Sequence, residues 1–326
     1  MRYVLEQKRK NSGFAGAKAP RDVGIILNSI GFQTLYYSDI SSKNILWRHV
    51  VSFFMILRLI LILRPKDECF IQWPLYTKFD SMLYLILKWK HIKFCVLIHD
   101  SKFIRYGKSM SLEKKFYQMS STIISHTDNM KHVIVKMGVN EKKIHVLNSF
   151  DYLIDECEIP KRSLSTSVAY AGNFYKASFL NNITNHPIGV PLFCYGRKNI
   201  DFSGDLIYKG FFHSDNVSKI EGSWGLVWDG DSEETCNGVY GEYLKMNSPH
   251  KLSLYIVARL PLIVWKESGL TDYVLKRNLG IAINSLRELP NRLKEITEKD
   301  YNYFLTCVDK ERLDLINGNH LKGCIS

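Results

Sequence analysis

Residues 224–264 read WGLVWDGDSEETCNGVYGEYLKMNSPHKLSLYIVARLPLIV, and this stretch decides the expected fold. Its first five residues, Trp224–Trp228, form a short apolar run that is typical of a buried strand. The run stops at Asp229-Gly230-Asp231, which is a turn signal, and a polar loop punctuated by glycines follows. The sequence therefore predicts that a buried strand ends at Asp229.

A helix is predicted to follow this loop. Ser248 is a good N-cap, and Pro249 suits the first helical position because its missing N–H would be unpaired there. Apolar residues continue at helical spacing until Leu260-Pro261 ends the helix, and residues 262–265 form another apolar strand. The unit is strand–loop–helix–strand, and its loop and helix start lie at the carboxyl edge of the sheet, where open α/β folds bind ligands.

Lys251 falls in the first turn of this predicted helix. The positive end of the helix macrodipole disfavours a cation there by a few tenths of a kcal/mol or more. A lysine at this place, with His250 beside it, is explained if an anion binds at the helix N-terminus. The alternative is a surface lysine whose stem packs along the helix while its charge reaches water.

The stretch WDGDSEETCNGVYGEYLKMNSPHKLSLY (228–255), together with YAGN at 170–173, closely resembles bacterial β-1,6-galactofuranosyltransferases of O-antigen synthesis. It also resembles the related streptococcal glucosyltransferases that extend protein-linked N-acetylglucosamine. The similarity is dense over 165–320 and sparser upstream, where GFAGAKAPRDV and LIHDSKFIR align. The resemblance implies a GT-B fold, in which two Rossmann-like α/β domains have parallel sheets that face each other across a cleft. It also implies a UDP-sugar donor and no metal.

The chain of 326 residues is long enough for two domains, and 46% apolar residues provide a substantial core. The net charge of +12 is unevenly distributed. Residues 1–150 hold 24 of the 44 Lys and Arg and 10 of the 32 Asp and Glu, so they carry +14 while the remainder carries −2. We therefore expect the first half to face an anionic partner.

An anionic membrane surface that carries a lipid-linked acceptor fits this charge better than nucleic acid does. The sequence has no zinc-finger spacing, RNA-binding aromatic signature or long basic arm, whereas basic surfaces bind anionic leaflets. The seven cysteines are odd in number and lie far apart without a CxxC pair, which favours a reducing cytosol over a disulfide framework or a zinc site. The start of the chain has no apolar region of signal-peptide length, so we expect a cytoplasmic protein, peripheral on the inner face of the membrane.

Strands alternate with helices along the first half, which predicts a parallel sheet. The first strand (1–5) leads into a glycine-containing loop with Gly13, Phe14 and Gly16, and a helix is expected to open at Pro20. Residues 46–63 are apolar over about the length that spans a bilayer, but charges interrupt them. We expect a helix buried in the domain that exposes one face to lipid, and a plain core helix is the alternative.

Asp100 follows the fourth predicted strand, and the loop 101–110 comes next. A His99-Asp100 pair at the carboxyl end of such a strand points toward a ligand cleft. The alternative is a turn in which Asp100 accepts hydrogen bonds from nearby backbone N–H groups.

The second domain is expected to open with a strand at 167–171 that runs into Gly172-Asn173. Residues 191–194 followed by Tyr195-Gly196-Arg197, and 206–209 followed by Gly210, repeat this pattern, which is compatible with a nucleotide lying across the strand ends. We expect an acceptor domain over 1–150 and a UDP-sugar domain over 160–300. By the resemblance, the segment 301–326 packs back on the first domain.

The resemblance assigns Lys251 to the donor diphosphate. Arg197 is a further phosphate candidate because its planar fork suits bidentate contact. Asp229 is expected to shape the loop or meet sugar hydroxyls. An inverting transfer also needs a base on the acceptor hydroxyl, for which Asp100 is the first candidate and Glu242 the second. The residues expected at the donor site are Gly16, Gly172, Asn173, Arg197, Asp229, Gly230, Asn247, His250, Lys251 and Tyr255.

We therefore predict a metal-independent glycosyltransferase without a cofactor. It would transfer a hexose, galactofuranose as the first choice, from a UDP-sugar to a glycan acceptor in O-antigen or capsule synthesis. The alternatives are a UDP-glucose-dependent glucosyltransferase acting on a glycoprotein or polysaccharide, a non-catalytic UDP-sugar-binding subunit, and a basic nucleic-acid-binding protein. The sequence leaves the donor sugar, the acceptor, the linkage and the oligomeric state open, a homo-oligomer included.

Overall fold

The computed structural model describes residues 1–8, 15–38, 45–75, 80–107, 111–154, 159–198 and 200–325. The chain divides into two compact units. The first comprises residues 1–126, 130–147 and 324–326, and the second comprises 127–129 and 148–323. Of the loop expected between the first strand and helix, Gly13 and Phe14 lie outside the described residues.

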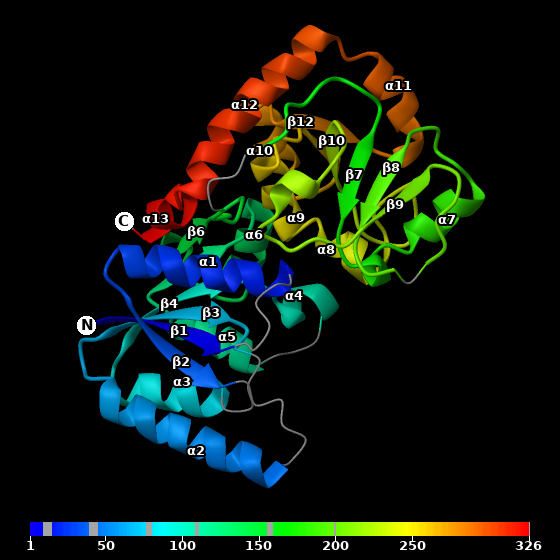
Figure 1. Cartoon of the computed structure of the whole chain (residues 1–326). Coiled ribbons are helices and arrows are strands. Elements are labelled where there is room, and N and C mark those ends of the chain that lie inside the picture. Colours follow the sequence, from blue (N-terminus) through cyan, green and yellow to red (C-terminus); the bar gives the residue numbers. More distant parts are fainter. Residues whose placement is uncertain are drawn as a thin grey trace. The chain divides into compact units, whose positions relative to one another are not determined.

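The first unit is built on a sheet of six parallel strands in the order β2-β1-β3-β4-β5-β6 (Figure 1). The strands are β1 (Arg2–Lys8), β2 (Gln33–Ser38), β3 (Glu68–Trp73), β4 (Lys93–Ile98), β5 (Thr122–Ser125) and β6 (Ile144–Val146). The central strands are buried on both faces, as their continuous apolar runs require. The predicted parallel sheet is confirmed.

Helices connect these strands, with α1 on one face of the sheet and α2 and α3 together on the other (Figure 1). They are α1 (Ala15–Ser29), α2 (Ile45–Ile62), α3 (Asp80–Trp89), α4 (Lys102–Tyr106), α5 (Ser111–Met119) and α6 (Asp128–Lys136). Pro20 lies inside α1 and does not open it, so that expectation was wrong. The loop expected over 101–110 instead begins with α4, because the Ser101 side chain accepts a hydrogen bond from the Ile104 backbone N–H and caps a helix there.

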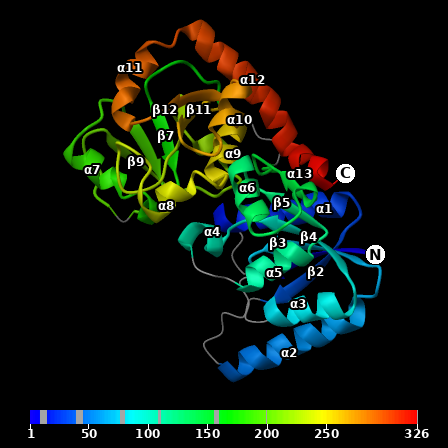
Figure 2. The ribbon, with the colours of Figure 1, turned by 180° about the vertical axis from the view of Figure 1, so that it is seen from behind.

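The apolar segment 46–63 forms α2, which lies beside α3; Figure 2 shows the pair from behind. Only its inner side, at Ile56 and Leu59, is buried against the unit, while Phe53 and Phe54 are exposed. The interpretation as a plain core helix was therefore wrong, because one face of α2 carries apolar side chains that nothing in the described structure covers. Among the described helices, none combines the length and the apolar character needed to cross a membrane.

The second unit has its own sheet of six parallel strands in the order β12-β11-β10-β7-β8-β9. The strands are β7 (Val168–Ala171), β8 (Leu192–Tyr195), β9 (Leu206–Gly210), β10 (Trp224–Val227), β11 (Leu262–Trp265) and β12 (Gly280–Ile283). Strand β7 pairs with both β8 and β10, although β10 comes much later in the sequence. The sheet order thus places the carboxyl ends of β7, β8 and β10 side by side.

The helices of the second unit are α7 (Phe179–Asn185), α8 (Gly238–Tyr243), α9 (His250–Val257), α10 (Thr271–Lys276), α11 (Leu289–Lys294), α12 (Glu298–Ile316) and α13 (Asn319–Ile325). Cys324 and Ile325, at the end of α13, group with the first unit. The helix expected to start at Pro249, with Ser248 as its N-cap, starts one residue later at His250, because Pro249 itself occupies the N-cap with extended backbone (ψ 139°). Helix α8 was not predicted; two glycines in six residues hide its tendency to form a helix.

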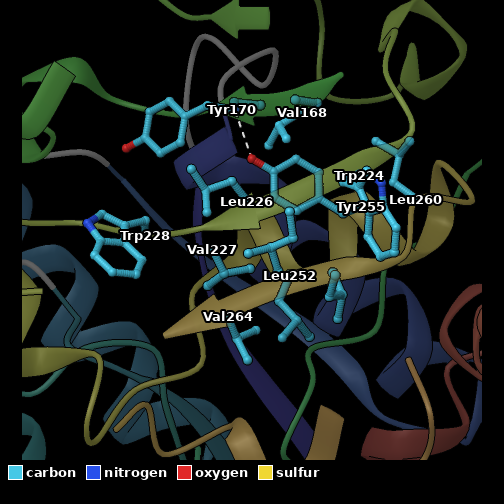
Figure 3. Packing of buried hydrophobic residues seen from close by; sticks show 14 of the residues in the cluster. Val168, Tyr170, Trp224, Leu226, Val227, Trp228, Leu252, Tyr255, Leu260 and Val264 are labelled. Atoms are coloured by element: carbon cyan, nitrogen blue, oxygen red, sulfur yellow. Dashed lines mark hydrogen bonds between the residues drawn. The ribbon is translucent and has the colours of Figure 1, made fainter. Parts of the chain in front are cut away.

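Helix α9 forms part of the core of the second unit. Figure 3 shows Leu252 and Tyr255 of α9 among the buried side chains of β7, β10 and β11. Helix α12 packs on α9, and the Arg259 guanidinium forms a two-pronged ion pair with Asp309, at 2.6 Å for each contact. The expectation that 301–326 packs on the first domain stays a prediction.

Candidate active site

The carboxyl end of β10 forms the floor of the candidate site. The strand continues through the fully buried Trp228 to Asp229, and the chain turns at Gly230 (φ 114°). A side chain at Gly230 would collide with the Asn237 backbone, and the Asp231 N–H donates to the Asn237 side-chain oxygen at 3.0 Å. The glycine and this hydrogen bond hold the loop so that the Asp229 carboxylate stays at the strand end.

Lys251 Nζ is surrounded by three acceptors. It lies 2.8 Å from Asp229 Oδ1, 3.0 Å from the Trp228 carbonyl oxygen and 3.2 Å from the Tyr170 hydroxyl. The side chains of Lys251 and Asp229 are only 9% and 11% exposed. The lysine is therefore no surface residue, and the anion that stabilises it in the first turn of α9 is Asp229.

Tyr170, at the end of β7, completes this cluster and was not among the predicted site residues. Its hydroxyl donates to Asp229 Oδ1 at 3.1 Å while it accepts from Lys251, whose ammonium also lies 4.3 Å from the centre of the tyrosine ring. Burial first, and the Asp229 carboxylate second, raise the pKa of Tyr170 well above its usual value. Tyr170 thus stays protonated and remains a hydrogen-bond donor to Asp229.

Tyr255 is a buried residue of α9 that holds the end of β7 in place. It is fully buried, and its hydroxyl accepts a hydrogen bond of 2.8 Å from the Ala171 backbone N–H. Gly225 has to lack a side chain because the Tyr255 ring occupies that space. Burial raises the pKa of Tyr255. Tyr255 has no exposed surface and fixes the end of β7, so a role at the donor site, which stays a prediction, would be to hold that strand end in place.

Gly172, Asn173 and Arg197 lie at the ends of the adjacent strands β7 and β8. The Gly172 N–H donates to the Tyr195 carbonyl at 2.9 Å, and a side chain at Gly196 would collide with the Gly172 carbonyl. Asn173 is exposed, and its side-chain oxygen accepts from the Tyr175 N–H at 3.1 Å. Arg197 is also exposed. The structure therefore brings these three residues to the same sheet edge as Asp229.

Two further predicted residues lie at the start of α9. His250 stacks on Tyr152, with the ring centres 4.8 Å apart. The Asn247 N–H donates to the Tyr243 carbonyl at 2.9 Å, and its side-chain oxygen is buried without a hydrogen-bond partner among the described residues. Such an oxygen can accept a hydrogen bond from a ligand.

Glu242, the second candidate base, lies on the surface of α8. Its side chain is 57% exposed and forms an ion pair of 2.9 Å with Lys245, which also pairs with Glu267 at 3.3 Å. The other candidate base, Asp100, belongs to the first unit.

Asp100 follows β4 and forms an ion pair with Arg105 of α4, with 2.7 Å between Oδ1 and the guanidinium. Their side chains are 18% and 13% exposed, so the pair is largely buried. Ser101 holds this segment by capping α4 and by donating to the buried Glu113, which also accepts from Tyr117 at 2.8 Å. Asp100 is thus a carboxylate held in place at the carboxyl edge of the first sheet.

Gly16 and Glu6 lie in the first unit as well. Gly16 is exposed in the first turn of α1, and a Cβ there would meet no atom within 4 Å. Glu6 of β1 was missed by the sequence interpretation. Its carboxylate packs against Gly24 of α1, and partial burial raises its pKa from the usual 4.5 to about 7. The alternation of residues along a strand does not indicate that the pKa of one carboxylate is raised.

One cluster among the described residues has a geometry that suits a metal ion, and it contains neither Asp229 nor Asp231. It consists of Glu311, Asp314 and His320. The Glu311 carboxylate already pairs with His320 at 2.8 Å and with Arg277 at 2.6 Å. A cation would have to displace the positive guanidinium, so this cluster is better suited to holding α12 and α13 together.

Two solved structures share the fold over nearly the whole chain. The lipopolysaccharide outer core galactosyltransferase WaaB has a TM-score of 0.59 with 11% identity and covers 100% of this chain and 99% of its own. WaaG, a glycosyltransferase involved in lipopolysaccharide biosynthesis, has a TM-score of 0.51 with 12% identity over 99% of this chain and 98% of its own. The fold is GT-B.

Curated relatives show the same relationship in sequence. The β-1,6-galactofuranosyltransferase WbbI of Escherichia coli K12 is 29% identical over 92% of this chain and 89% of the relative. Glucosyltransferase 3 of Streptococcus parasanguinis is 23% identical over 73% of this chain and 71% of the relative. The resemblance stated from the motif at 228–255 is confirmed.

The family models match both halves of the chain. The Glucosyltransferase 3-like N-terminal domain matches residues 1–149, and the Glucosyltransferase 3-like C-terminal domain matches residues 168–326. Together with the two parallel sheets and the polar cluster at the end of β10, these matches show that the chain is a GT-B glycosyltransferase of the Glucosyltransferase 3-like family.

Proposed function

We propose that this glycosyltransferase takes a hexose from a UDP-sugar and transfers it to a glycan acceptor of a bacterial surface polysaccharide. The observation that carries the proposal is the buried cluster of Lys251, Asp229 and Tyr170 at the start of α9. A cation at a helix N-terminus, beside glycines at neighbouring strand ends, is the arrangement that binds a diphosphate. Galactofuranose is our first choice of sugar because the relative WbbI is a galactofuranosyltransferase.

The ion pair between Lys251 and Asp229 gives the donor a defined way to bind. A diphosphate that approaches the N-terminus of α9 competes with Asp229 for the Lys251 ammonium. The Asp229 carboxylate, which keeps the hydroxyl of Tyr170 as a donor, can then accept hydrogen bonds from sugar hydroxyls. The exchange keeps Lys251 paired, because one anionic partner of the lysine replaces another.

The chemical step breaks the bond between the anomeric carbon and the diphosphate oxygen and forms a bond from that carbon to the acceptor oxygen. Lys251 and the helix N-terminus stabilise the charge that develops on the leaving UDP. If an α-linked donor gives a β-linked product, the reaction inverts, and a base takes the proton from the attacking hydroxyl. Asp100 is our first candidate for this base and Glu242 the second.

The acceptor in this proposal is a lipid-linked glycan at the inner face of the cytoplasmic membrane. The excess of basic residues in 1–150 supports it. A UDP-glucose-dependent transfer is the second candidate function, because two streptococcal relatives are named Glucosyltransferase 3. The two candidates share one donor site and differ only in the sugar and the acceptor.

A panel of UDP-sugars tests this proposal. Purified protein is titrated with UDP, UDP-galactofuranose, UDP-galactopyranose and UDP-glucose by calorimetry, and slow donor hydrolysis is followed by release of UDP. We expect UDP to bind and one sugar nucleotide to be hydrolysed faster than the others. Absence of UDP binding would contradict the donor assignment, and UDP binding without hydrolysis or transfer of any sugar would favour a non-catalytic binding subunit.

A further inference from the structure

The outer side of α2 and α3 carries large apolar side chains in contact with solvent. We name this surface the α2–α3 face, and we define it by six residues whose exposed fractions lie between 59% and 72%. They are Trp47, Phe53, Phe54 and Leu61 of α2 and Leu85 and Trp89 of α3. The two helices lie side by side on one face of the first sheet (Figures 1 and 2), so these residues belong to one surface of the first unit.

Exposure of this kind is unfavourable in water. Burying one Phe or Leu side chain fully is worth about 1.5–3 kcal/mol, and soluble monomers rarely leave several such residues together. Ile56 and Leu59 on the opposite side of α2 already pack into the unit, so α2 is apolar on both sides. A helix that is apolar all round is normally covered on both sides.

The segments that form the α2–α3 face are rich in cations. Residues 45–66 contain Arg48, Arg58, Arg64 and Lys66 but no Asp or Glu. Arg64 and Lys66 are exposed just after α2, and Lys88 is exposed near the end of α3. The Lys90 ammonium donates to the Leu63 carbonyl at 2.6 Å and so joins the ends of the two helices.

The exposed apolar side chains and the cations together distinguish between the partners that could cover the α2–α3 face. A second copy of the chain would place the same Arg and Lys residues opposite each other, and like charges oppose that contact. A bilayer with anionic headgroups offers hydrocarbon for the Phe and Leu side chains, an interface for the two Trp rings and negative charge for the flanking cations. The charges therefore favour lipid over a self-contact.

We propose that the α2–α3 face binds the surface of an anionic membrane, with α2 lying in the plane of the headgroups. None of the described helices is able to span the bilayer. The inference does not depend on which sugar is transferred, because the α2–α3 face belongs to the first unit and the Lys251 cluster to the second. The charge asymmetry alone names no surface, whereas this inference names one and gives membrane binding an apolar contribution.

Vesicle sedimentation with the full chain tests this inference. Vesicles of phosphatidylcholine alone are compared with vesicles that also contain phosphatidylglycerol, in low salt and in about 0.5 M NaCl. The variant F53Q/F54Q removes two exposed apolar side chains of the face. The matched control L313Q/Y303Q changes two residues of α12 that are each 55% exposed.

We expect the wild type and the control to bind the anionic vesicles, with weaker binding in high salt. F53Q/F54Q should bind them roughly tenfold more weakly or worse, since two large apolar contacts are lost. Its UDP affinity and its melting temperature should stay at the wild-type values. This separates a loss of membrane binding from a failure of the donor site.

Three outcomes would overturn the proposal. Equal binding to neutral and anionic vesicles would remove the role of the cations, and unchanged vesicle binding by F53Q/F54Q would remove the role of the apolar face. An oligomer that F53Q/F54Q converts to a monomer in light scattering, without vesicle binding by the wild type, would show that a second copy covers the face. Quenching of Trp47 and Trp89 fluorescence by brominated lipid, lost in W47F/W89F, would support the proposed depth.

Discussion

The substitution Lys251→Met tests the centre of the proposed donor site. Methionine keeps most of the length and the apolar stem of lysine but removes the charge. In the wild type the ammonium satisfies Asp229, Tyr170 and the Trp228 carbonyl at 2.8 to 3.2 Å. The substitution therefore removes the cation proposed to bind the diphosphate and, at the same time, the partner of a buried carboxylate.

The structure gives a magnitude for each effect. The side chains of the pair are 9% and 11% exposed, and removing one partner of a buried ion pair destabilises a protein by about 3–5 kcal/mol. For a unit of this size, each kcal/mol lowers the melting temperature by about 2–4 °C. A lost charge-assisted contact of about 1.5–3 kcal/mol weakens UDP binding by roughly 10- to 150-fold. Binding and stability should both fall.

The double variant K251M/D229N separates the two effects. Removing the orphaned charge of Asp229 should restore much of the stability, but it cannot restore a cation for the diphosphate. UDP binding should therefore stay weak in the double variant. D229N alone should bind UDP at least as well as the wild type, because Lys251 then has no competing carboxylate.

The assay is calorimetric titration with UDP at a temperature where each variant is folded, together with thermal unfolding. The matched control is Lys276→Met, which changes an exposed lysine of α10 that also pairs with an aspartate, at 2.9 Å. We expect the control to change neither UDP affinity nor melting temperature measurably. UDP affinity of folded K251M within about threefold of the wild type would refute the assignment of Lys251 to the diphosphate.

Three further predictions concern the rest of the site. D100N should lower turnover by roughly 10²–10⁴ with UDP binding preserved; if turnover survives within about threefold, E242Q is tested as the alternative. The pKa of Glu6 is raised from the usual 4.5 to about 7, so the folded state holds the proton more tightly than the unfolded state does. The contribution of this group to the free energy of unfolding is therefore fully present below about pH 4.5 and is lost as the pH rises through about 7. At pH 8 the free energy of unfolding of E6Q, measured in urea, should therefore exceed that of the wild type by about 1 kcal/mol, a value reduced to allow for the partial exposure of Glu6. At pH 4.5 the two proteins should be equally stable. Equal stabilities at both pH values would exclude this linkage. Transfer should continue in excess EDTA because Lys251 and a helix N-terminus are proposed to neutralise the diphosphate, and loss of activity that Mn²⁺ restores would show a metal requirement at Asp229 and Asp231.

Much of the second unit could be predicted because its strands are short apolar runs between turn signals. Strand β11 has the predicted bounds, 262–265. The error at the start of α9 is small in sequence but has a physical cause. A proline fits either the N-cap or the first helical position, and the two differ mainly in whether its ψ angle is extended or helical.

The contacts of the site could not be predicted from spacing alone. Lys251 was recognised by its unfavourable place in a helix, but its partner Asp229 is 22 residues earlier and Tyr170 is 81 residues earlier. Only the sheet order, which puts β7 beside β10, brings these ends together. Likewise, the pKa of Glu6 depends on a close approach to Gly24 that strand and helix patterns do not specify.

The buried ion pair also explains how such a site can select a complete donor. In the proposed donor site, binding of a diphosphate would separate Lys251 from Asp229, and an unpaired carboxylate at this depth is unfavourable unless new donors reach it. UDP supplies the anion for Lys251 but no hexose hydroxyl for Asp229, whereas a UDP-sugar supplies both. Tyr170, which donates to Asp229 and accepts from Lys251, can keep its bond to the carboxylate during the exchange. On this proposal, the free energy that the hydroxyls recover at Asp229 would favour the intact sugar nucleotide over the product UDP, and it would help UDP leave once the sugar has been transferred.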